Sequence, residues 1–122
     1  MGHGDRSIRR VVQVDWPGVE ALAARVRESF PDATLLLFGS RARGTADEDS
    51  DYDFCVISRA FAGWKPWERM VSLAELWTLP APVEIVAYTP EEWERLGPWT
   101  FVQTIRAEGR PVSPRAPSPP AA

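Results

Sequence analysis

The sequence predicts one α/β (α+β) domain in which helices pack on a small β-sheet. Its 122 residues suffice for one core but leave no room for a second domain. Hydrophobic residues make up 44% and charged residues 25%, the balance of an ordinary globular protein. Short apolar runs alternate with stretches of helical periodicity, and this alternation is typical of a sheet covered by helices.

The expected helices have apolar residues at three- and four-residue spacing, with proline or glycine near their ends. We expect them at 19–30, at 64–77, from Pro90 to the break at Gly97, and at 99–108. Short apolar runs bounded by turn residues predict strands at 33–38, 52–58 and 83–88. The segment 39–49 is expected to be a loop with a helical turn at 40–43.

Domain boundaries are placed where the apolar pattern stops. Residues 1–10 are polar and expected to be flexible, and residues 11–112 are expected to form the domain. Little burial is expected from Pro111 onward, and residues 113–122 are predicted to be a disordered, proline-rich tail.

Composition argues against several partners and locations. The net charge is −3 and no basic face is evident, so nucleic acid is an unfavoured partner. No apolar run approaches the ~20 residues that span a bilayer, and no signal peptide is expected at the N-terminus. The single cysteine, Cys55, excludes an internal disulfide and fits a reducing cytosol, so we expect a cytoplasmic protein.

Tryptophan is abundant for a chain of this length. Most of the six tryptophans are expected in the core. The helix at 64–77 has apolar residues on more than one face. It can therefore either be buried within the domain or cover the sheet and also form a protein–protein surface.

The segment after the first strand combines phosphate-binding residue types. Gly39 and Ser40 follow that strand directly, and Arg41, Arg43 and Gly44 come next. Glycine lets the backbone N–H groups approach an anion, and guanidinium groups donate to phosphate oxygens in a fork. This segment therefore predicts a phosphate-binding loop.

Five acidic residues follow within seven positions: Asp47, Glu48, Asp49, Asp51 and Asp53. Such a cluster repels itself unless cations are near. Asp51 and Asp53 are two apart at the start of a strand, so both face the same side about 6–7 Å apart. Their carboxylates are hard oxygen ligands that suit a pair of Mg²⁺ ions.

Glu84 is a third candidate ligand. It interrupts an otherwise apolar strand, where a carboxylate needs a partner. If this strand neighbours the one that carries Asp53, Glu84 can join the metal site and accept the proton of an attacking hydroxyl.

Other motifs do not fit. An EF-hand fails because Phe54 stands where glycine is required and Ala60 where glutamate is required. A P-loop fails because Thr45 and Ala46 stand in place of its lysine and its serine or threonine. His3 is the single histidine, so a Ser-His-Asp triad or a histidine-based RNase is excluded unless His3 folds back.

These residues together resemble the nucleotidyltransferase superfamily that includes DNA polymerase beta. That pattern is Gly-Ser, about ten residues (here 41–50), Asp-x-Asp, and a third carboxylate on a later strand. The strings 38–53 and 104–112 are similar to the single-domain branch, the minimal nucleotidyltransferases, and the resemblance covers roughly residues 19–112.

The resemblance implies a polymerase beta-like fold with a small mixed sheet and a definite set of roles. Gly39 and Ser40 would hold the triphosphate of ATP, Asp51 and Asp53 would bind Mg²⁺, and Glu84 would match the third carboxylate. That third position is often aspartate, so the extra methylene of Glu84 is a departure from the family pattern.

The resemblance also implies an acceptor. Many minimal members are antitoxins paired with a small all-helical HEPN-type protein, and some transfer AMP to a tyrosine of it. We therefore expect an antitoxin-type adenylyltransferase. Relatives that modify aminoglycosides carry an additional helical domain; a small-molecule transferase, which would need a second subunit or a homo-oligomer, and a non-catalytic nucleotide-binding module are the alternatives.

Overall fold

The computed structural model describes residues 10–114. Its helices are α1 (Trp16–Ser29), α2 (Gly39–Arg43), the 3₁₀ helix η2 (Arg59–Phe61), α3 (Pro66–Ala74), α4 (Pro90–Arg95) and α5 (Thr100–Glu108). Its strands are β1 (Thr34–Phe38), β2 (Tyr52–Ile57), β3 (Val83–Tyr88) and β4 (Arg110–Val112). Among these residues no helix combines the length and the apolar character needed to cross a membrane.

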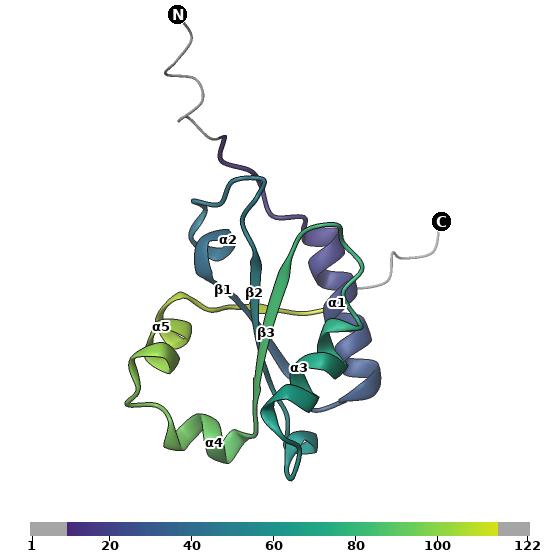
Figure 1. Cartoon of the computed structure of the whole chain (residues 1–122), viewed down its shortest axis with the longest axis vertical. Helices are drawn as coiled ribbons and strands as arrows, with labels where there is room; N and C mark the ends of the chain where they lie inside the picture. The colour runs from purple at the N-terminus through teal and green to yellow at the C-terminus, as the bar shows by residue number, and fades with distance from the viewer. Residues whose placement is uncertain (1–9, 115–122) are drawn as a thin grey trace, which may run out of the picture.

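The four strands form one mixed sheet in the order β3-β2-β1-β4, shown in Figure 1. β1 pairs antiparallel with both β2 and β4, whereas β2 and β3 are parallel. A parallel pair needs a crossover connection, and here α3 lies within it. The predicted α/β class with a small mixed sheet is therefore confirmed.

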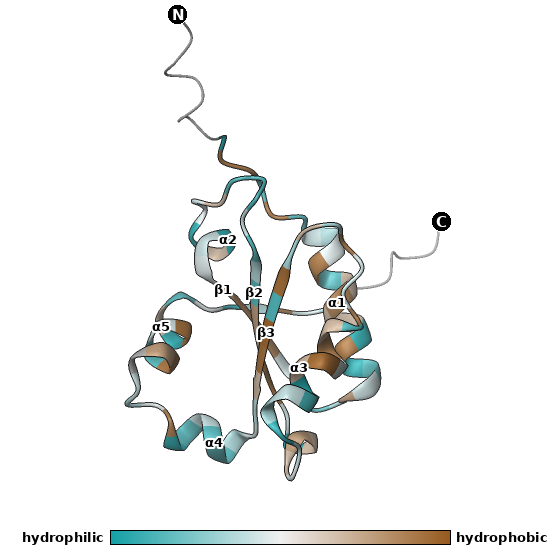
Figure 2. Ribbon diagram, in the orientation of Figure 1, coloured by the Kyte–Doolittle hydropathy of each residue, from teal (hydrophilic) through white to brown (hydrophobic). Residues whose placement is uncertain are grey.

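Helices cover both faces of the sheet. α1 and α3 lie on one face, and α4 and α5 lie on the other (Figure 1). The larger core cluster is on the α1 side, where Phe54 and Leu37 are fully buried. The smaller cluster, around Phe38, Cys55 and Ile105, is on the α5 side. Figure 2 shows the strands hydrophobic through the middle of the sheet, as two covered faces require.

The fourth strand was not anticipated. Pro111 and Val112 belong to β4, which pairs with Leu36 and Leu35 of β1, and Val112 is buried. The expectation that little is buried from Pro111 onward is thus wrong at Val112, whereas Pro111 is in the strand but exposed. A proline is tolerated because β4 is an edge strand with one side free of ladder bonds. Residues 115–122 of the predicted tail, and 1–9 of the predicted flexible N-terminus, lie outside the described residues.

The tryptophans are less buried than expected. Trp64, Trp67 and Trp99 are exposed, and Trp67 retains 59% of its accessible surface. α3 is also shorter than predicted, and its buried residues are Arg69 and Leu73. The expectation that most tryptophans are in the core is therefore wrong. Trp67 lies on the outward face of α3, and Trp64 and Trp99 lie just before α3 and α5, while the other three are half-buried against the core.

Arg69 is a buried cation that ties α3 to its neighbours. Its Nε donates to the Trp64 carbonyl at 3.1 Å, and its Nη2 donates to the Phe61 carbonyl at 2.9 Å. Nη1 donates to the Ala87 carbonyl of β3 at 3.1 Å and to Glu92 at 2.6 Å. Its donors thus join η2, α3, β3 and α4.

The ion pair between Arg69 and Glu92 makes the stability of the fold sensitive to acid. The hydrogen bond from Arg69 lowers the pKa of Glu92 below its ordinary value of 4.5. Because folding lowers this pKa, the ion pair contributes its full stabilisation above about pH 4.5. That contribution is lost as the pH falls through the pKa of Glu92 in the folded state. We expect the free energy of unfolding to fall below pH 4.5 in urea titrations. Glu92→Gln should flatten that fall, and an unchanged pH profile in this variant would contradict the assignment.

Candidate functional site

Gly39 and Asp53 meet where β1 ends and β2 begins. Phe38 and Asp53 are ladder partners, so Gly39 begins α2 directly beside the Asp53 carboxylate. Gly39 has φ +76, and a Cβ built on it would overlap Asp53 Oδ2. Both the backbone conformation and the close approach therefore require glycine here.

Glu84 lies on the adjacent strand at the same level. The parallel pairing places Asp53 opposite Glu84, on neighbouring strands about 4.8 Å apart, and ladder partners point to the same face. That face is the α5 side, because Cys55, two residues after Asp53, packs against Ile105. The two strands are neighbours, which is the condition for a role of Glu84 at this site, and Glu84 is exposed at the mouth of the sheet.

The carboxylates interact electrostatically. Burial first, and then the negative charges of Glu84 and Asp51, raise the pKa of Asp53 from 3.8 to about 6. The positive charge of Arg43 opposes the shift. The site therefore holds an excess of negative charge that a cation would relieve.

The carboxylates of Asp51, Asp53 and Glu84 do not converge on a common metal-binding position. Within residues 10–114 no group of three or more His, Cys, Asp or Glu side chains is placed to hold a metal ion. The donor chemistry nevertheless fits a hard divalent cation, since Asp51, Asp53 and Glu84 offer only carboxylate oxygens. As ladder partners on neighbouring strands, Asp53 and Glu84 have their side chains on the same face of the sheet.

The two arginines of α2 have different environments. Arg43 is 49% exposed in its side chain and pairs with Glu108 at 3.0 Å. Arg41 is buried, donates to the Ser50 carbonyl at 2.7 Å and lies 4.2 Å from the centre of the Tyr52 ring. Arg41 therefore anchors the acidic loop to the sheet, and its contact with phosphate stays a prediction.

Ser40 is partly exposed at the first turn of α2. Its carbonyl accepts the N–H groups of Gly44 and Thr45, which close the helix. Phe38, at the N-cap, has no side chain that could accept a hydrogen bond from the first turn. The N-cap side chain therefore does not occupy the backbone N–H groups in the first turn of α2.

Part of the acidic cluster forms a turn. The Asp47 carboxylate accepts the N–H of Asp49 at 2.9 Å and the hydroxyl of Ser50 at 3.2 Å. The Asp47 N–H in turn donates to Ser50 Oγ at 3.0 Å. This local network shapes the loop that leads into β2. Of the five acids, Asp47 and Asp49 thus take part in this turn, whereas Asp53 is in β2.

Glu108 is a site residue that sequence reasoning missed. Its Oε1 accepts the N–H of Gly39 at 3.3 Å, and both its oxygens accept from Arg43 Nη1 at 3.0 Å. It is the last residue of α5, 69 positions from Gly39. The available signal was the family-like string 104–112, which includes Glu108.

Replacing Gly39 tests the close approach to Asp53. Gly39→Ala should reduce the free energy of unfolding by more than the roughly 1–2 kcal/mol that a left-handed conformation costs an L-residue. Gly63→Ala is the control, because Gly63 has φ +83 but nothing within 4 Å of an added Cβ. If urea denaturation shows that Gly39→Ala and Gly63→Ala lose the same free energy of unfolding, the predicted overlap with Asp53 is contradicted.

Comparisons with known proteins agree with this geometry. A family model described as a nucleotidyltransferase domain matches residues 19–110. A crystal structure of a candidate nucleotidyltransferase from Sulfolobus solfataricus is 24% identical, with a TM-score of 0.51 over 63% of this chain and 68% of that one. A crystal structure of a toxin-antitoxin with AMP-PNP is 22% identical, with a TM-score of 0.50 over 84% and 75% of the two chains. At these identities the likeness shows the fold alone. No curated protein matches.

Proposed function

We propose, from the premise that the chain belongs to the nucleotidyltransferase domain family, that it is a Mg²⁺-dependent enzyme transferring AMP from ATP to a hydroxyl group of a protein partner. The observation that supports this most is the junction of Gly39, Asp53 and Glu84 on three neighbouring elements. A phosphate-binding backbone, a metal-binding carboxylate and a candidate base adjoin one another there.

The proposed roles follow from the position of each group. Gly39 and Ser40 would hold the triphosphate through the start of α2, and the exposed guanidinium of Arg43 would bind phosphate oxygens. Asp51 and Asp53 would hold two Mg²⁺ ions, which when bound neutralise the charge of the reacting phosphates.

Glu84 has the position of a general base. Its side chain is exposed, so an incoming hydroxyl can reach it, and it lies opposite Asp53 on the same face. A carboxylate that accepts the hydroxyl proton makes the oxygen a better nucleophile toward the α-phosphorus, with pyrophosphate leaving. The same side chain completes the proposed metal-binding set.

The proposed partner is a small all-helical protein of the HEPN type, with this chain as the antitoxin-type subunit. One structural neighbour is a toxin-antitoxin complex. The outer face of α3 exposes Trp67, Met70 and Val71, which gives the chain an apolar surface suited to a protein partner.

The test is to incubate the protein with Mg-ATP and the product of the neighbouring gene, then to seek an AMP adduct by mass spectrometry. We expect an adduct on one hydroxyl side chain of the partner, and none when EDTA is present. If no divalent metal supports an adduct, the transferase proposal fails. Full neutralisation of the partner by an adduct-deficient variant would instead indicate a docking module.

A further inference from the structure

Glu108 occupies the donors that the proposed function assigns to phosphate. Its carboxylate accepts from the Gly39 N–H at 3.3 Å and from Arg43 Nη1 at 3.0 Å with both oxygens. The Glu108 side chain retains 24% of its accessible surface, so it lies at the mouth of the site and outside the core. An anionic group of this chain thus sits where a phosphate oxygen would bind.

We propose that Glu108 determines nucleotide affinity by closing the site, and that the triphosphate must displace its carboxylate from Gly39 and Arg43. This inference rests on the proposed function, because it concerns the same phosphate-binding groups. Carboxylate and phosphate oxygens are both acceptors, and Gly39 has a single N–H to donate. Glu108 and a phosphate oxygen therefore compete for that N–H.

The contact of Glu108 with Arg43 and Gly39 can be broken at low energetic cost. Arg43 and Glu108 are 49% and 24% exposed, and an ion pair of this exposure contributes little to stability. Glu108 is the last residue of α5, so its side chain can rotate away without moving the helix. Arg43 would then be free to bind phosphate with the donors that it now gives to Glu108.

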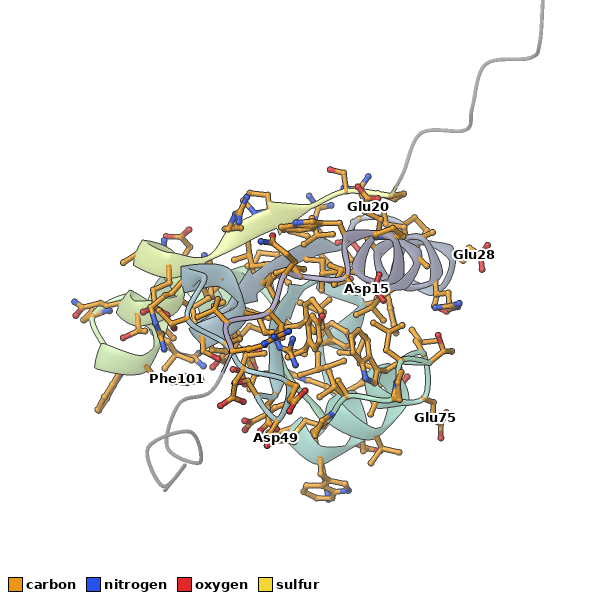
Figure 3. All side chains as sticks on the ribbon, turned by 90° about the horizontal axis from the view of Figure 1, so that it is seen from above. Asp15, Glu20, Glu28, Asp49, Glu75 and Phe101 are labelled. Atoms are coloured by element: carbon orange, nitrogen blue, oxygen red, sulfur yellow. The ribbon has the colours of Figure 1, made fainter. Side chains whose placement is uncertain are left out.

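If Glu108 competes with phosphate, removing its charge should strengthen nucleotide binding. Glu108→Gln keeps an oxygen that can accept from Gly39 but removes the negative charge beside the triphosphate. Glu28→Gln is the matched control, because it makes the same change of charge on exposed α1; Figure 3 shows Glu28 at the edge of the molecule opposite Phe101.

The experiment is calorimetric titration of the full chain with Mg-ATP, at low and at high salt. We expect Glu108→Gln to bind Mg-ATP about three- to tenfold more tightly than the unaltered protein and Glu28→Gln to bind as the unaltered protein does. The gain should shrink at high salt, because added ions screen exposed charges. Inorganic triphosphate should show the same order of affinities.

Other outcomes separate this inference from the proposed function. If the unaltered protein binds Mg-ATP and Glu108→Gln binds equally or more weakly, Glu108 does not compete and this inference is wrong while the proposed function stands. Lack of binding by both proteins would overturn both. Should Glu108→Gln unfold, the Gly39 amide resonance of the unaltered protein decides the matter: it should shift on addition of Mg-ATP, and an unmoved resonance under saturating binding overturns the displacement.

Discussion

Asp53→Asn is expected to abolish AMP transfer, with a loss of roughly a thousandfold or more, since charge stabilisation by a bound metal is worth several kcal/mol. Asp53 has its carboxylate beside Gly39 and is the ladder partner of Glu84. Transfer to the partner is measured by mass spectrometry with Mg-ATP.

The same substitution should stabilise the metal-free fold. Burial and the charges of Glu84 and Asp51 raise the pKa of Asp53 to about 6, so its ionised form is disfavoured in the folded state. A raised pKa means that stability is lost as the pH rises from about 4 to about 6. At pH 7 we expect Asp53→Asn to gain about 1–2 kcal/mol, a value reduced for partial exposure.

The matched control for this variant is Asp49→Asn, which makes the same change of charge in the loop before β2. Asp49 is exposed and is labelled at the rim of the molecule in Figure 3. The Asp49→Asn variant should keep an AMP transfer and a free energy of unfolding close to those of the unaltered protein. Equal losses of transfer in the two variants would mean that general negative charge, and not Asp53, matters.

Arg69→Ala is expected to have the largest effect on stability, about 3–5 kcal/mol, because it removes a buried cation that donates to one carboxylate and three carbonyls. The carbonyls belong to Phe61, Trp64 and Ala87, and the carboxylate to Glu92. Such a loss is a large part of the 5–15 kcal/mol that typically stabilises a domain. Urea denaturation measures it directly.

Two further variants make this prediction specific. Arg69→Lys should recover little, since an ammonium group cannot donate in the planar fork that reaches four acceptors. Arg27→Ala, on the exposed face of α1, should change stability by less than about 0.5 kcal/mol. A loss below 1 kcal/mol for Arg69→Ala would contradict the structural role assigned to this residue.

Most of the candidate site was predictable from sequence because its components are local. Gly39 and Ser40 follow one strand. Asp51 directly precedes the next strand and Asp53 is its second residue, so spacing along the chain places these residues at one end of the sheet. β3 was predicted with its observed bounds because six consecutive residues between prolines and threonine form a clear strand pattern.

Features formed by distant segments could not be predicted in this way. Glu108 reaches Gly39, and Arg69 reaches Glu92 across 23 positions, and neither contact leaves a local pattern. Val112 is buried only because β4 pairs with β1, whereas its proline-rich surroundings indicate disorder. Charged residues are ordinarily read as exposed, so the burial of Arg41 and Arg69 was invisible in the sequence.

The central claim is that Asp51, Asp53 and Glu84 bind divalent metal together with a nucleoside triphosphate. It is tested most directly by a crystal structure with Mn²⁺ and a non-hydrolysable ATP analogue, using anomalous scattering to locate the metal. We expect Mn²⁺ bound by oxygens of Asp51, Asp53 and Glu84, phosphates on Gly39 and Ser40, and Glu108 turned away from Gly39. Nucleotide bound elsewhere, or an anomalous signal distant from Asp53, would contradict it.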